Sequence, residues 1–144
     1  MHLILKDGQA LYYSVRKLRQ DNPNTSFPAE MSDAFLAEWD VFPYSIPESP
    51  DYDRLTQRLS AAPLVQIKGA WVQPWQVDKL PLDQAESNVR SHRDDILQET
   101  DWRVIKAAEK ATSLTPEWAS YRQALRDVTK QDGFPFSVKW TLQP

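Results

Sequence analysis

The spacing of apolar residues changes near residue 80, and this change constrains the fold more than any other feature of the chain. Before it, two short apolar stretches flank Asp-Gly at 7–8, and apolar and polar residues alternate around Lys-Gly at 68–69, which predicts two β-hairpins. After it, apolar residues recur every three or four positions, which predicts helices. We therefore expect an α+β protein: amino-terminal β-hairpins with short helices over residues 1–80, and a helical hairpin ending in an extended arm or strand over residues 81–144.

Local signals in the first part predict two short helices and a connector. Ser14 is expected to cap one helix, which ends before Pro23, and Ser32 or Asp33 to cap a second, which Pro43 stops. The Pro-rich and polar segment 43–63 is expected to be an irregular connector. Pro74, within the second hairpin, indicates an edge strand or a bulge.

In the second part, Asp83 followed three residues later by Glu86 predicts a capping box at the start of a long helix. That helix is expected to continue past a kink near Thr100-Asp101.

The last helix is expected to begin at Thr115-Pro116, where a hydroxyl cap precedes proline at the first helical position, and to run to about Lys130. Gly133 is expected to end it in a left-handed conformation. The segment "FPFSVKW" then predicts a final strand or an extended arm.

The residues that enzymes use are scarce. The chain has no cysteine and only two histidines, His2 and His92, and all three glycines are assigned to turns or a helix end, so none remains for a phosphate-binding loop. The carboxylate pairs at 51/53 and 94/95 are read as solvated surface, because acid–base catalysis needs two carboxyls that converge on one cleft. We therefore predict no catalytic residues, no metal site and no cofactor, and hence no enzyme.

Charge and hydropathy limit the partners. The 17 basic and 20 acidic side chains give a net charge of −3, which offers no electrostatic basis for binding nucleic acid. No apolar run approaches the roughly 20 residues that span a bilayer, and the start lacks the features of a signal peptide. These observations predict a protein that binds neither nucleic acid nor membrane and folds in a cytoplasm.

Large rings and arginines gather in the last helix and the segment after it. Trp118, Tyr121, Leu125 and Val128 are three, four and three positions apart, so they share one stripe of the helix. This stripe is expected to pack on the preceding helix around Ile96, with Tyr121 half-buried because its hydroxyl needs water or a partner.

Two readings remain open for the other members of this group. Arg122 and Arg126 either form a solvated flank, paired with Glu117 or Asp127, or line the rim of a protein interface. The rings that follow the helix either fold back on the hairpin sheet or rest on another protein. On the interface reading, the partner-binding residues are Trp118, Tyr121, Arg122, Arg126, Phe134, Phe136 and Trp140.

At these residues the sequence resembles a known family. The segment "RDDILQETDWRVIKAAEK…EWASYRQALRDVTKQDGFPFSVKW", within residues 83–140, is similar to the carboxyl-terminal domain of phage tail assembly chaperone proteins. Many relatives finish with Trp-Pro and further prolines, whereas this chain finishes with "WTLQP". The matching positions are Arg93, Thr100, Asp101, Trp102, Trp118, Tyr121, Arg122, Leu125, Arg126, Gly133, Phe134, Pro135 and Trp140.

The resemblance implies a non-enzymatic role in building a phage tail, through binding of a tail or tail-fibre protein in the host cytoplasm. An alternative is a permanent structural subunit of the tail, such as a baseplate or fibre-attachment protein, which would remain in the virion. A homo-oligomer is compatible with either reading.

Overall fold

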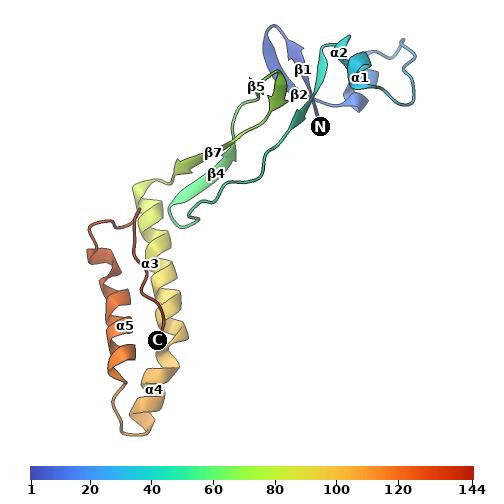
Figure 1. Cartoon of the computed structure of the whole chain (residues 1–144). Helices are drawn as coiled ribbons and strands as arrows, with labels where there is room; N and C mark the ends of the chain where they lie inside the picture. Colours follow the sequence, from blue (N-terminus) through green and yellow to red (C-terminus); the bar gives the residue numbers. More distant parts are fainter. The chain divides into compact units, whose positions relative to one another are not determined.

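The computed structural model describes residues 1–144 and divides them into two compact units (Figure 1). Unit 1 comprises residues 1–51 and 59–76, and unit 2 comprises residues 52–58 and 77–144. Strands dominate the first unit and helices the second, which confirms the α+β class.

The sheet of unit 1 has five strands in the order β2-β1-β3-β6-β5. Both predicted hairpins are present: β1–β2 turns at Asp7 (φ 52°) and Gly8 (φ 77°), and β5–β6 turns at Lys68 (φ 50°) and Gly69 (φ 85°). Two consecutive positive φ angles are what a two-residue hairpin turn of the favoured twist requires. The strands are β1 (His2–Lys6), β2 (Gln9–Tyr13), β3 (Val41–Ser45), β5 (Val65–Ile67) and β6 (Ala70–Val72).

Two short helices, α1 (Val15–Asp21) and α2 (Asp33–Ala37), cover one face of this sheet. The predicted caps are confirmed, because the Ser14 hydroxyl accepts from the Lys17 amide at 3.1 Å and the Ser32 hydroxyl from the Phe35 amide at 3.2 Å. The core beneath the helices is formed by Leu18, Leu36 and Val41, with Ile4, Tyr13, Val15, Phe27, Met31 and Trp39 packed around them.

The expectation of an irregular connector over 43–63 is wrong at both ends. Pro43 lies inside β3, and a further strand, β4, spans Gln57–Ala61. The Leu5 amide of β1 donates to the Asp40 carbonyl, and the Tyr44 amide donates to the Met1 carbonyl just before β1. Because alternate residues of a strand face opposite neighbours, the nitrogen of Pro43 points away from β1. Pairing of β3 with β6 begins only at Tyr44, and the missing N–H of Pro43 therefore costs no ladder bond.

Strand β4 pairs with β7 (Trp75–Lys79) in a separate two-stranded sheet. Pro74 lies between β6 and β7, so it marks the point where the chain leaves one sheet for the other. The chain passes from one unit to the other at three points: between Asp51 and Tyr52, within β4 and within β7.

Unit 2 is a helical hairpin made of α3 (Leu82–Glu99), α4 (Asp101–Glu109), α5 (Pro116–Arg126) and a 3-10 turn, η1 (Asp127–Lys130). The break at Thr100 and the start of α5 after Thr115 are confirmed, but the Thr115 hydroxyl makes no capping hydrogen bond. The capping box is not formed: α3 begins at Leu82 after Pro81, and no side chain caps it. Asp83 therefore lies inside the first turn, where its charge still complements the helix dipole.

After η1 the chain makes turns through residue 137 and continues as an irregular arm to Pro144, which runs back along α3 (Figure 1). The expectation that Gly133 ends the helix in a left-handed conformation is wrong, because the helical segment ends at the extended Gln131 and the φ of Gly133 is not positive. Position 133 instead requires glycine for a steric reason. A Cβ at this position would collide with the Ser137 carbonyl oxygen and lie 2.9 Å from the Ser137 Cβ. The Ser137 amide bonds the Gly133 carbonyl at 2.6 Å, and this tight turn is what excludes a side chain.

Candidate partner-binding surface

Arg122 holds the helical hairpin together from inside. The residue is only 6% exposed. Its guanidinium donates to the Leu97 carbonyl at 2.8 Å, to the Thr100 hydroxyl, and to an Asp101 carboxylate oxygen at 2.6 Å. These acceptors are the last turn of α3 and the first residue of α4, so a single side chain of α5 fixes the break between the other two helices.

The apolar stripe of α5 is buried as its spacing predicts. Trp118, Tyr121 and Leu125 pack against Ile96 and Leu97 of α3, together with Leu114 and Trp140. Tyr121 is more deeply buried than expected. Arg122 pairs with Asp101 rather than with Glu117 or Asp127. Contact of these α5 residues with a partner stays a prediction, and in the free chain they lie beneath the surface.

The three rings of the arm fold back on their own unit. The Arg90 guanidinium lies 5.1 Å from the centre of the Phe134 ring, and the Lys79 ammonium lies 5.2 Å from that of Phe136. Trp140 meets His92 edge-on at 4.9 Å between ring centroids. Each ring remains half-buried, and two of them are in contact with cations, Phe134 with one of α3 and Phe136 with one of β7.

The remaining family-motif positions have local roles. Arg93 pairs with its neighbour Asp94 at 2.7 Å, and Pro135 is buried in the turn after Gly133. Arg126 is exposed on α5.

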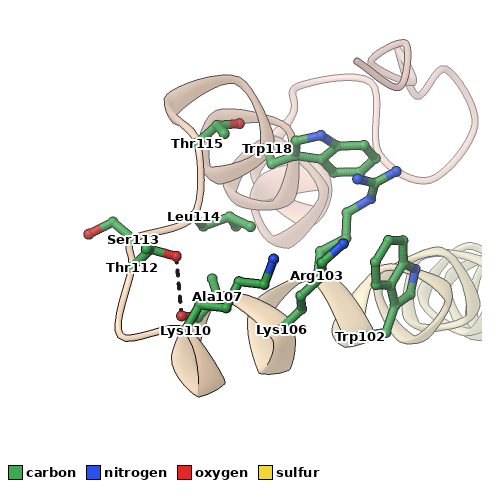
Figure 2. Close-up of a pocket in the computed structure, with 10 residues that line it drawn as sticks. All are labelled: Trp102, Arg103, Lys106, Ala107, Lys110, Thr112, Ser113, Leu114, Thr115 and Trp118. Atoms are coloured by element: carbon green, nitrogen blue, oxygen red, sulfur yellow. Dashed lines mark hydrogen bonds between the residues drawn. The ribbon is translucent and has the colours of Figure 1, made fainter.

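Helix α4 has no buried residue. Trp102 is 50% exposed and Ile105 is 58% exposed, which is unusual for large apolar side chains in an amphipathic helix. A pocket of about 240 Å³ opens between α4 and the start of α5, walled by the indoles of Trp102 and Trp118 and by Leu114 (Figure 2).

Cations surround this pocket. Arg103 rises between the two indoles, with its guanidinium carbon 3.7 Å from the ring centre of Trp118 and 4.6 Å from that of Trp102 (Figure 2). The Lys106 ammonium lies 5.5 Å from the Trp102 ring centre, and Lys110 also lines the pocket. No carboxylate lines it.

Sequence reasoning did not identify this pocket, although a signal existed. Arg103, Lys106 and Lys110 are three and four positions apart, which is the spacing of one helix face. The sequence analysis named Trp102 only as a family-motif position. It did not consider Leu114, which lies in the loop before α5.

Outside the pocket, one residue of the helical unit has a shifted pKa. The pKa of Asp127 lies below its ordinary value. The main cause is a hydrogen bond from the Lys130 ammonium to its carboxylate, and a hydrogen bond from the Gln123 amide adds to the effect. No group of three or more His, Cys, Asp or Glu residues is arranged to hold a metal ion. No helix has the length and apolar content needed to cross a bilayer.

The fold and the surface define a small α+β protein whose helical unit ends in an exposed aromatic and cationic pocket. Residues 86–144 match the family model described as phage tail assembly chaperone protein, which confirms the resemblance as a partial match. The match covers about two fifths of the chain and includes most of α3, all of α4 and α5, and the arm. Neither the curated proteins nor the solved structures gave a match.

Proposed function

We propose that this chain is a non-enzymatic phage tail assembly factor that binds a tail or tail-fibre protein and assists its folding or assembly. The family match carries the proposal, because it coincides with the helical part of unit 2. A chain with this role acts in the host during assembly of the virion.

The exposed residues of α4 support a binding role. Trp and Arg are enriched at protein interfaces, and exposed apolar side chains rimmed by charge often mark such surfaces. Trp102, Arg103 and Ile105 provide this combination on a helix that contributes nothing to its own core.

Co-expression tests the proposal. The chain, carrying an affinity tag, is produced together with the tail and tail-fibre proteins encoded beside it. We expect one of them to co-purify and its soluble yield to rise relative to expression alone. Recovery of the tagged chain alone, with no change in the solubility of any tail protein, would contradict a role in assembly.

A second candidate is a permanent structural subunit of the tail, and unit 1 supports it. Residues 1–85 lie outside the family match, and they include the exposed edge strand β5 and a 59% exposed Tyr12. Unpaired strand edges can join another chain by strand addition. Mass spectrometry of purified particles separates the candidates, because a transient assembly factor is absent and a structural subunit is present in fixed copy number.

A further inference from the structure

We propose that the pocket between α4 and α5 binds a polypeptide segment that carries carboxylates beside a large apolar side chain. The inference rests on the proposed function, since it names the chemistry of the segment that a tail protein would offer. The pocket is defined by Trp102, Arg103, Lys106, Lys110, Leu114 and Trp118.

Its cations form no ion pair within the chain. Five ion pairs occur in the structure, and none involves Arg103, Lys106 or Lys110. In a chain of net charge −3, three unpaired cations around one pocket form a local field of the opposite sign. Such a field attracts carboxylates and repels basic segments.

Arg103 is already placed to receive a carboxylate. Its guanidinium stacks at 3.7 Å from the ring centre of Trp118 and makes no hydrogen bond to the chain. Stacking occupies the faces of a guanidinium and leaves its N–H edge free, and that edge matches the two oxygens of a carboxylate. Holding the side chain between two rings also reduces the conformational entropy lost on binding.

The apolar residues that line the pocket indicate which apolar group the bound segment should carry. Two indoles and Leu114 enclose about 240 Å³, enough for one large side chain rather than a folded element. Ile105, exposed on the same helix, extends the apolar surface beyond the pocket. A segment with Leu or Phe next to Asp or Glu would satisfy both the rings and the cations.

Polypeptide is favoured over nucleic acid because the cations form one small cluster rather than a stripe along the surface. Binding of a strand needs a basic groove that follows many phosphates. Only three cations line this pocket.

Fluorescence anisotropy with the full chain tests the inference. The probes are three labelled peptides, acidic with an apolar centre ("EDLFED"), acidic without it ("EDSSED") and basic with it ("KRLFKR"), together with a short single-stranded oligonucleotide. We expect the first peptide to bind at least about tenfold more tightly than the other two, and its affinity to fall as salt rises. Equal binding of all three peptides, or preferential binding of the oligonucleotide, would overturn the inference.

Charge reversal locates the site. The double variant Lys106→Glu/Lys110→Glu changes two exposed side chains and should weaken binding of "EDLFED" by about tenfold or more. The matched control reverses two exposed cations that do not line the pocket, Lys6→Glu and Lys139→Glu together, and should stay within about twofold. Thermal unfolding of each variant confirms that the fold is kept. Equal loss in the double variant and the control would assign binding to net charge and overturn the site.

The same variants in the co-expression experiment separate this inference from the proposed function. A tail protein that co-purifies equally well with the parent chain and the double variant upholds the assembly role and overturns the pocket as its site. Peptide binding that the double variant abolishes, without capture of any tail protein, upholds the pocket and overturns the assembly role.

Discussion

The guanidinium of Arg122 lies 2.6 Å from a carboxylate oxygen of Asp101, and the two residues are 21 positions apart in the sequence. The arginine is buried, whereas the aspartate side chain is 54% exposed. The pair therefore reaches from the inside of the helical hairpin to its surface. With the Leu97 carbonyl and the Thr100 hydroxyl as further acceptors, it sets where α3 ends and α4 begins.

Replacing Arg122 with methionine should destabilise unit 2 by about 2 kcal/mol, because the variant removes three hydrogen bonds, two of them to partly buried or buried acceptors at the end of α3. Asp101→Asn should cost less than about 1 kcal/mol, since the carboxylate is largely solvated. Denaturant unfolding followed by far-ultraviolet circular dichroism measures both free energies.

The matched control is Arg126→Met, which removes an exposed arginine from the same helix and should be nearly neutral. If Arg122→Met and Arg126→Met had the same effect, the interior hydrogen bonds would contribute nothing measurable to stability.

Gly133 should tolerate no side chain. Gly133→Ala places a methyl group against the Ser137 backbone and should cost about 1–3 kcal/mol. Gly133→Asn should cost at least as much, because asparagine relieves a left-handed backbone and does nothing for a collision.

Gly69 gives the opposite pattern and serves as the control. Its φ is 85° and no heavy atom lies within 4 Å of an added Cβ, so asparagine should be tolerated better than alanine. Unfolding free energies of the four variants test the contrast, and a better-tolerated asparagine at Gly133 would contradict the steric explanation.

Trp140 should anchor the arm. Its indole packs on the cluster formed by Trp118, Tyr121 and Leu125, and it meets His92 edge-on. Trp140→Ala should therefore cost about 1–3 kcal/mol, somewhat less than for a fully buried ring. It should also speed hydrogen exchange in the arm, because the anchor is lost.

Deletion of residues 141–144 is the comparison for Trp140→Ala. All four residues are exposed, so their removal should change stability by less than about 0.5 kcal/mol. An equally large loss from both changes would show that the whole end of the chain, rather than the indole, holds the arm in place.

Features encoded by neighbouring residues could be predicted from the sequence. The serine caps, both hairpin turns, the break at Thr100 and the start at Thr115-Pro116 each depend on a few adjacent side chains and backbone angles. The buried stripe of α5 followed from its period alone. The capping box failed because the helix begins one residue before Asp83.

Features that depend on distant residues could not be predicted. Asp101 was known only as a motif position, and nothing local indicates that its partner is Arg122. The need for glycine at position 133 comes from the carbonyl of Ser137, which approaches only once the turn has formed. The pocket on α4 was missed because the exposure of an amphipathic face depends on what the rest of the chain leaves uncovered.

The last prediction concerns Tyr13 in unit 1. Desolvation by burial is the main cause that raises its pKa to about 12, and the Asp21 carboxylate, which accepts a hydrogen bond from the Tyr13 hydroxyl with 2.7 Å between the oxygens, adds to the effect. The folded state therefore keeps this proton to a higher pH than the unfolded chain, whose tyrosines titrate near 10. The resulting stability is fully present below pH 10 and is lost as the pH rises toward 12.

Ultraviolet titration of the phenolates should show one of the five tyrosines ionising near pH 12. Tyr13→Phe should remove that step and reduce the loss of stability between pH 10 and 12, whereas Tyr52→Phe should leave both in place. A late step that persists in Tyr13→Phe would assign the raised pKa to another tyrosine and would contradict this explanation for Tyr13.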